Sequence, residues 1–319
     1  MMKRPEDAAR WLLDRDRFLI LTHIRPDGDT TGCAIALCLG LRSLGKDAWI
    51  WENPQFSGRF LPRMDGMLRT DLADDATLVA VDMATESLLP HGAAALAGKA
   101  QLCIDHHPSN TFYAADTLLD ATCAACGELL YSVLEAMGVT FTPAMAEAIY
   151  IAISTDTGCF RFSNTSARTF ETAAACVRHG AAIAPINRQL FEIKTRGRLE
   201  LESRMIASMD FYCGGKVAIC CLPQSLVEQL GVTEDDLDSI SGFPRTIEGV
   251  QVGAVIRDSE PGKVKFSVRT AAGYNASTYC AALGGGGHAA AAGASIPGTL
   301  AEGKEALLSV LRQDKTLWK

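Results

Sequence analysis

The first part of the chain alternates short, almost uninterrupted apolar runs with longer helical patterns. Three of the runs, Phe18–Leu21, Thr77–Val81 and Gln101–Ile104, have the length of single strands. Their apolar residues are continuous rather than alternating, which is typical of strands that are buried on both faces of a parallel sheet. Helical patterns such as Thr31–Leu44 supply the crossover connections that parallel strands need. The sequence therefore predicts an α/β fold built on a parallel sheet.

The chain is long enough for two domains. Its 319 residues exceed what one hydrophobic core usually organises, and the strand and helix pattern starts again after Gly214 and Gly215. The charged stretch before these glycines contains few helix-breaking residues, which indicates a helical connector. We therefore expect a parallel-sheet N-terminal domain over residues 1–185, a helical connector over 186–210 and a smaller α/β C-terminal domain over 211–319.

Composition and charge exclude several classes of protein. Hydrophobic residues make up 48% of the chain and charged residues 21%, which is typical of a globular protein. No apolar run approaches the roughly 20 residues of a membrane span, and the charged start lacks the apolar segment of a signal peptide. We expect a cytoplasmic protein without a membrane partner. The formal net charge of -7 argues against long nucleic acid as a partner.

The eleven cysteines are scattered through apolar runs and their number is odd, which fits buried thiols better than a disulfide framework. Cys123 and Cys126 form one C-x-x-C pair, but no second pair completes the four ligands of a structural zinc site. We expect no disulfides and a structural role for this pair.

Four apolar elements end in residue types that bind metal ions. They run into Thr22-His23-Ile24-Arg25-Pro26-Asp27-Gly28-Asp29, into Asp82, into Asp105-His106-His107 and, at the end of the helix from Pro143, into Asp156. Any one of these motifs alone also fits a turn or a packed histidine. Because ligands bind outside the carboxyl ends of the strands in open α/β sheets, the four endings should converge on one site.

The convergent residue types indicate which ion they would bind. Clustered aspartates repel one another unless cations or hydrogen bonds offset their charge. Carboxylates with imidazoles and no thiolate favour ions such as Mn²⁺ over structural zinc. We therefore predict two bound divalent metal ions, Mn²⁺ first, with Mg²⁺ or Co²⁺ as alternatives.

The same residues resemble the motif set of the DHH phosphoesterase family. The spacing H-x-x-x-D-x-D from His23 to Asp29, the strand-terminal Asp82 and the D-H-H triplet from Asp105 are specific to that family. The resemblance extends to the second domain, where Gly284-Gly-Gly-Gly-His288 resembles the G-G-G-H motif of the DHH-associated domain. Cys33 departs from the serine that is frequent at its position, and we expect little effect from it because it lies inside the predicted helix.

The resemblance implies roles for individual residues. His23 and Asp27 would hold one ion, and Asp29, His106 and Asp156 the other, with Asp82 bridging both. The catalytic set would be Asp82, Asp105 and His107, in which Asp105 orients an imidazole and His107 faces the substrate phosphate. Substrate contacts would come from Arg269, Gly285, Gly286, Gly287 and His288. Arg161 is a further candidate for contacting substrate, from its position five residues past Asp156 rather than from the resemblance. The active site would then lie in the cleft between the two domains.

The glycine run also favours phosphate binding on physical grounds. Glycines let the backbone approach an anion closely, and the alanine-rich segment after His288 predicts a helix whose N-terminal amides favour phosphate. These features together predict a phosphate cradle in the second domain.

The function that the resemblance implies is metal-dependent hydrolysis of phosphate esters, with a water molecule activated between two ions. The substrates would be short oligoribonucleotides, 3′-phosphoadenosine 5′-phosphate or linear dinucleotides such as pApA, which the sequence does not rank. A pyrophosphatase or polyphosphatase and a non-catalytic nucleotide-binding regulator are the alternatives. The Gly-His motif argues against the first alternative, and the presence of every expected ligand argues against the second. The oligomeric state stays open, with a homodimer as one alternative.

Overall fold

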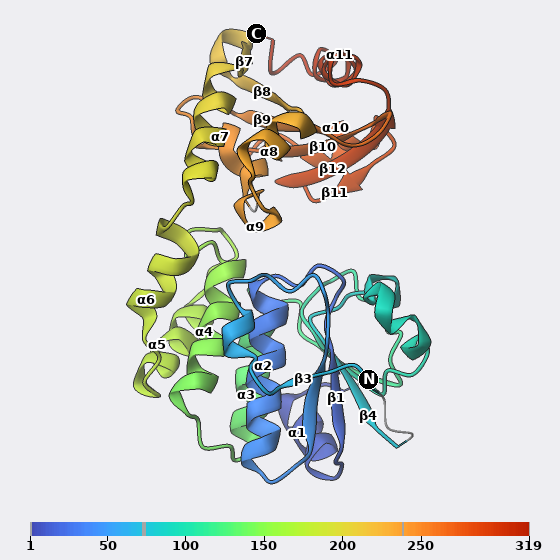
Figure 1. Ribbon diagram of the computed structural model, residues 1–319, viewed down its shortest axis with the longest axis vertical. Helices are drawn as coiled ribbons and strands as arrows, with labels where there is room; N and C mark the ends of the chain where they lie inside the picture. Colours follow the sequence, from blue (N-terminus) through green and yellow to red (C-terminus); the bar gives the residue numbers. More distant parts are fainter. Residues whose placement is uncertain (1, 72–74, 238, 319) are drawn as a thin grey trace. The chain divides into compact units, whose positions relative to one another are not determined.

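The computed structural model describes residues 2–71, 75–237 and 239–318, and the chain divides into two compact units, 1–193 and 194–319 (Figure 1). Each unit is built on its own six-stranded sheet. None of the helices in the described ranges combines the length and the apolar character that a membrane span requires.

The sheet of the first unit is parallel throughout, with the strand order β3-β2-β1-β4-β5-β6. Its strands are β1 (Phe18–Leu21), β2 (Ala48–Trp51), β3 (Leu68–Arg69), β4 (Thr77–Val81), β5 (Leu102–Asp105) and β6 (Asp116–Leu119). The order reverses between β1 and β4, which lie side by side. Open α/β sheets bind ligands outside the carboxyl ends of the strands at such a reversal.

The central strands are covered on both faces. Phe18, Ile20 and Val79 share one core with the helices of the unit, which lie together on one side of the sheet (Figure 1). These helices are α1 (Pro5–Leu13), α2 (Gly28–Ser43), α3 (Cys126–Ala136), α4 (Pro143–Asp156) and α5 (Ala167–Arg178). Leu19 and Leu78 point to the other face, into a core that includes the short helix η3 (His91–Leu96). This double burial explains why the strands are apolar at nearly every position.

Glycines bring the start of α2 against the end of α4. A Cβ atom on Gly28 would lie 2.3 Å from Cγ2 of Thr155, and one on Gly32 would lie 2.3 Å from the carbonyl oxygen of Ala148. No larger residue fits at either position without a shift of the helices. The contact places the first turn of α2 beside the last turn of α4.

The sheet of the second unit is mixed, with the order β11-β12-β10-β9-β8-β7. Strands β8 (Val217–Leu222) and β9 (Val252–Glu260) pair in parallel, and the other neighbours are antiparallel: β7 (Asp210–Tyr212), β10 (Lys263–Thr270), β11 (Gly286–Gly287) and β12 (Ala291–Pro297). Helices α10 (Ala276–Ala281) and α11 (Leu300–Leu311) pack into one core cluster with the sheet. Helices α7 (Arg196–Ala207), α8 (Gln224–Leu230) and α9 (Glu234–Leu237) pack into another.

The predicted α/β class is confirmed, but the helix expected after His288 is wrong. Residues Ala291–Pro297 form strand β12, which pairs with β10 from Lys263↔Pro297 to Arg269↔Ala291. Ala292 and Ala294 are buried in the same core as α10 and α11, where small side chains fill one face of the strand. Pairing and packing therefore override the intrinsic preference of alanine for helix.

The stretch expected as one helical connector is interrupted. It consists of α6 (Ile183–Asn187), a π-helical turn η4 (Arg188–Glu192) and helix α7. Ile193 is extended, and the side chain of Thr195 accepts a hydrogen bond from the amide of Arg198 as the N-cap of α7. A threonine cap satisfies a backbone donor at a helix start, which favours a new helix at this point.

Candidate metal centre

Polar side chains from several elements meet at the carboxyl edge of the parallel sheet. They are His23 and Asp27 after β1, Asp29 in the first turn of α2, Asp82 after β4, His106 after β5 and Asp156 at the end of α4. Their oxygen and nitrogen atoms form groups in which all members lie within 4.8 Å of one another: His23, Asp27 and Asp82; Asp29, His106 and Asp156; Asp82, His106 and His107. The structure thus brings together all six residues that the sequence analysis assigned to metal binding.

Asp82 belongs to two of the three groups and is held by hydrogen bonds from two sides. It is 2% exposed, and its backbone is left-handed with φ 52°, a conformation that aspartate adopts more readily than most residues. Its amide donates to the carbonyl of Ile104 at 2.9 Å, and the hydroxyl of Thr30 donates to its Oδ2 at 2.6 Å. Its Oδ1 is buried and has no hydrogen-bond partner among the described residues.

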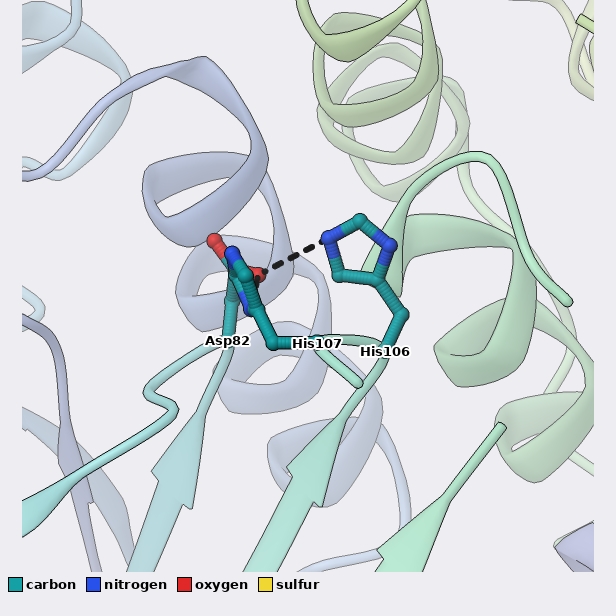
Figure 2. Close-up of side chains that lie close together, drawn as sticks. All are labelled: Asp82, His106 and His107. Atoms are coloured by element: carbon teal, nitrogen blue, oxygen red, sulfur yellow. Dashed lines mark ion pairs between the residues drawn. The ribbon is translucent and has the colours of Figure 1, made fainter. Parts of the chain in front are cut away.

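His106 presents an acceptor nitrogen to this cluster. Its Nδ1 lies 3.2 Å from the carbonyl oxygen of Cys123, and because a carbonyl only accepts, we assign the proton to Nδ1. The lone pair of Nε2 then faces Asp82 Oδ1 at 3.5 Å (Figure 2). Asp156 Oδ2 lies 3.4 Å from the same nitrogen. Within the described ranges, this buried Nε2 also has no hydrogen-bond partner.

These two unpartnered atoms fit a metal ion. Asp82 Oδ1 and His106 Nε2 are both buried, and neither has a hydrogen-bond partner in the described part of the chain. Buried acceptors without a donor are unfavourable, and a cation would satisfy both. The oxygen and nitrogen donors suit a borderline-hard divalent ion.

Asp29 is fixed by the start of helix α3. Its two carboxylate oxygens accept hydrogen bonds from the amides of Cys126 at 2.6 Å and Gly127 at 2.9 Å. The amides at a helix N-terminus are ready-made donors for an anion. The thiol of Cys33 also donates to Asp29 at 3.3 Å, so the position that we expected to have little effect contacts the site. Cys126 thus contributes through its backbone, and all eleven cysteines are free thiols.

Burial and mutual repulsion shift the protonation of the cluster. Burial raises the pKa of Asp156 to about 9, and the charges of Asp29 and Asp27 add to the effect. Burial and the charge of Asp29 raise the pKa of Asp82 well above its ordinary value. Burial likewise raises the pKa of Asp29, although His106 opposes it. The metal-free cluster therefore holds protons at neutral pH that a metal ion must displace.

Asp105 orients the imidazole of His107. Its Oδ1 accepts from Nδ1 of His107 at 2.8 Å and from the amides of His106 and His107, and Asn110 donates to its Oδ2 at 2.6 Å. Burial raises the pKa of Asp105, but the hydrogen bonds from His107 and Asn110 together bring it below its usual value. The hydrogen bond to Asp105 in turn raises the pKa of His107. The His107 ring stands beside Asp82, with Nδ1 3.5 Å from Oδ1 (Figure 2).

In the second unit, Arg269 and His288 lie on neighbouring strand ends. Arg269 pairs with Ala291, and the backbone of His288 bonds to the same Ala291 in both directions. Arg269 is half-buried and donates to the hydroxyl of Ser241 at 2.9 Å. His288 is exposed.

The glycines before His288 are required by the strand pairing. A Cβ atom on Gly285 would lie 2.1 Å from the carbonyl oxygen of Gly293, and one on Gly287 would lie 2.6 Å from Cα of Ala292. Gly286 has open space around its Cα. Gly285 and Gly287 thus permit the close β11–β12 pairing, and Gly286 is the position at which an approaching ligand would meet bare backbone.

Two supporting residues were missed by the sequence analysis. Thr30 binds Asp82, and Asn110 binds Asp105. Thr30 stands directly after Asp29, one residue before the predicted helix Thr31–Leu44 and in the first turn of the observed α2, a position at which a hydroxyl could have been noticed. Asn110 follows the D-H-H triplet in an irregular loop, where no periodic pattern marks it. Arg161 lies exposed on the turn after Asp156, and its side chain donates to the carbonyl of Gly158.

Two family models match this sequence. The one described as "DHH family, N-terminal domain" matches residues 17–153, and the one described as "DHHA1 domain" matches residues 214–314. The first match contains every candidate metal ligand except Asp156, and the second contains Arg269 and His288.

Relatives match over nearly the whole chain. A protein of Thermus thermophilus is 33% identical over 301 residues, which cover 93% of this chain and 90% of the relative. A protein of Bacillus subtilis is 25% identical over 292 residues, covering 88% and 90%. Both are named bifunctional oligoribonuclease and PAP phosphatase NrnA. The crystal structure of an exopolyphosphatase-related protein from Bacteroides fragilis shares the fold, with a TM-score of 0.86, 21% identity and coverage of 98% and 97% of the two chains.

We expect Mn²⁺ binding to release protons and to strengthen as the pH rises. Because burial raises the pKa of Asp156 to about 9, a metal ion at neutral pH must displace its proton. Calorimetric titrations in two buffers with different ionisation enthalpies measure the number of protons released, and Asp156→Asn should reduce it.

The raised pKa of Asp156 also makes the stability of the metal-free folded state depend on pH. The folded state binds this proton more tightly than the unfolded chain, whose aspartate titrates near 3.8. The contribution of Asp156 to stability is therefore full below that value and is lost as the pH rises toward about 9.

The Mn²⁺ titrations would contradict this electrostatic account if they showed almost no proton release together with an Mn²⁺ affinity that does not change between about pH 6 and about pH 8.

Proposed function

We propose a function from one premise: the chain belongs to the DHH family. The proposed activity is metal-dependent hydrolysis of phosphate esters in short oligoribonucleotides, including linear dinucleotides, and in 3′-phosphoadenosine 5′-phosphate (PAP). Two relatives, which match 93% and 88% of this chain, are named for both an oligoribonuclease and a PAP phosphatase activity.

The observation that carries the proposal is the pair of buried, unpartnered acceptors at the sheet edge. Asp82 Oδ1 and His106 Nε2 face each other at 3.5 Å within a cluster of aspartates. A structural role alone would leave both atoms without compensation. A bound cation accounts for them and for the concentration of carboxylates.

We assign two divalent ions to this cluster, with Mn²⁺ as the first choice. His23 and Asp27 would hold one ion, Asp29, His106 and Asp156 the other, and Asp82 would contact both, which agrees with the groups of neighbouring ligand atoms. Two such ions supply an activated water at neutral pH and offset the negative charge that develops on the phosphate.

The chain itself supplies a proton donor. Nδ1 of His107 is held by Asp105, which leaves Nε2 of the same ring to face substrate. The hydrogen bond to Asp105 raises the pKa of His107. The doubly protonated imidazole, which can donate a proton, therefore persists to a higher pH than in a free histidine. We assign His107 to binding a phosphate oxygen and to protonating the oxygen of the leaving group. Asp105 positions this ring, since both its oxygens are occupied by hydrogen bonds.

The second unit is assigned to substrate binding. Arg269, Gly286 and His288 lie on adjacent strand ends and turns and offer a guanidinium, open backbone and an imidazole to a phosphate. Arg161, on the turn after Asp156, is assigned to the same task in the first unit.

One pair of variants separates metal binding from substrate binding. Asp82→Asn keeps the shape, the acceptor for Thr30 and a residue that tolerates a left-handed backbone, but removes the charge. We expect kcat to fall at least about 100-fold and Mn²⁺ binding to weaken. His288→Ala should lower kcat/KM for nucleotide substrates and leave the Mn²⁺ stoichiometry unchanged.

The measurements are steady-state kinetics with Mn²⁺ and a metal titration of each variant. Chelator should stop the wild-type enzyme, and added Mn²⁺ should restore it. Near-normal kcat in Asp82→Asn would refute the assigned metal site. Loss of metal by His288→Ala would show that the assignment of His288 to substrate binding is wrong.

Activity should fall with substrate length. The net charge of -7 provides no general excess of positive charge along which a long phosphate backbone could bind. We therefore expect the highest kcat/KM for RNAs of two to about five nucleotides and for PAP, and a decline toward about 24 nucleotides, at one fixed salt concentration. Equal or rising efficiency on the longest RNA would exclude the preference for short substrates, whereas turnover of pyrophosphate alone would favour the pyrophosphatase alternative.

A further inference from the structure

A phenylalanine is exposed on the turn that follows Asp156. The side chain of Phe162 is 57% exposed, among the most exposed of the large apolar residues in the described chain. An aromatic ring exposed to water is unfavourable, so a ligand that covers this ring would gain binding free energy.

The turn that carries Phe162 is held in a strained conformation. Gly158, Cys159 and Phe160 have consecutive left-handed backbones with φ of 56°, 58° and 62°. For the two residues that are not glycine this conformation is unfavourable, and such strain persists where surrounding structure enforces it, often at functional sites.

Thr157 is the residue that enforces the turn. It is fully buried, its hydroxyl accepts from the amide of Phe160 at 3.1 Å, and its carbonyl accepts from the amides of Arg161 at 2.9 Å and Phe162 at 3.0 Å. The backbone of Phe162 is therefore fixed before any ligand binds. A fixed aromatic ring loses little conformational freedom when it binds a ligand.

The turn is also tied to the metal centre. The side-chain amide of Asn164 donates to the carbonyl of Asp156 at 3.1 Å and to that of Ala124 at 3.1 Å. The Phe162 ring packs on Gly158, with ring atoms 2.4–2.7 Å from the position that a Cβ would take there. Because only glycine leaves this room, the ring lies against the backbone two residues beyond Asp156.

We propose that Phe162 is a stacking platform for a nucleobase of the substrate. The inference rests on the proposed function and adds to it a residue that determines how the substrate is recognised. A nucleobase is a flat aromatic ring joined to the reacting phosphate through one ribose, which keeps it near the metal centre. Stacking on an aromatic side chain is available to every base, so it suits PAP and short RNAs of any sequence.

Phe170 provides a matched control in the same unit. It is also 57% exposed, but it belongs to helix α5 and its ring stacks on that of Phe160 at 5.4 Å. It is not part of the turn that Thr157 holds. Phe170→Ala therefore tests the general effect of removing an exposed phenylalanine near this turn.

The experiment compares a ribodinucleotide with two analogues, each lacking one of its bases. Steady-state kinetics with Mn²⁺ are measured for the wild type, Phe162→Ala, Phe162→Trp and Phe170→Ala. We expect Phe162→Ala to raise KM for the intact dinucleotide about 5- to 100-fold with a smaller change in kcat. The same substitution should have no effect on the analogue that lacks the stacked base. Phe162→Trp should restore the wild-type KM, and Phe170→Ala should leave it unchanged.

Three results would overturn the proposal: an unchanged KM in Phe162→Ala, an equal rise for the intact dinucleotide and both analogues, or an equal rise in Phe170→Ala. A wild-type enzyme that hydrolyses neither short RNA nor PAP would instead refute the proposed function itself. The two failures are therefore distinguishable. Metal titration and thermal unfolding of Phe162→Ala should match the wild type, since the ring is exposed and holds no ion.

Discussion

Repulsion among buried carboxylates has to be offset for the first unit to keep its structure. Asp29, Asp82 and Asp156 converge at the carboxyl edge of the sheet, and burial together with the charge of neighbouring aspartates raises the pKa of each. Protons relieve this repulsion in the metal-free chain, in which Asp82 Oδ1 and His106 Nε2 have no hydrogen-bond partner within the described structure. A divalent cation relieves both conditions at once. Metal binding, protonation and the stability of this edge are therefore coupled.

The surrounding fold holds the ligands in place while their charges oppose each other. Apolar strands buried on both faces end at one edge, so that residues following β1, β4 and β5 meet. Gly28 and Gly32 let α2 approach α4, which brings Asp29 toward Asp156. Hydrogen bonds then fix the individual side chains: the α3 amides bind Asp29, and Thr30 binds Asp82. A site whose ligands are positioned before the ion arrives spends less binding free energy on ordering them.

The sequence predicted the parts of this arrangement that depend on short periodic patterns. The runs Phe18–Leu21 and Thr77–Val81 coincide with β1 and β4, because double burial leaves a continuous apolar signal. The rule that ligands gather beyond strand ends then located the cluster. The prediction was wrong for Ala291–Pro297, where pairing with β10 decides the structure and alanine composition does not. The partner of Asp105, the contact of Cys33 with Asp29 and the turn before Phe162 depend on contacts within irregular loops or between side chains, which leave no periodic trace in the sequence.

The central claim is that the aspartate and histidine cluster holds two metal ions. Crystals grown with Mn²⁺ and measured at the manganese absorption edge would locate the ions directly by anomalous scattering. The account predicts two peaks roughly 3.5–4 Å apart, one beside His23 and Asp27, the other beside Asp29, His106 and Asp156, with Asp82 in contact with both. A single peak, or peaks outside this cluster with Asp82 Oδ1 and His106 Nε2 still unpartnered, would contradict it.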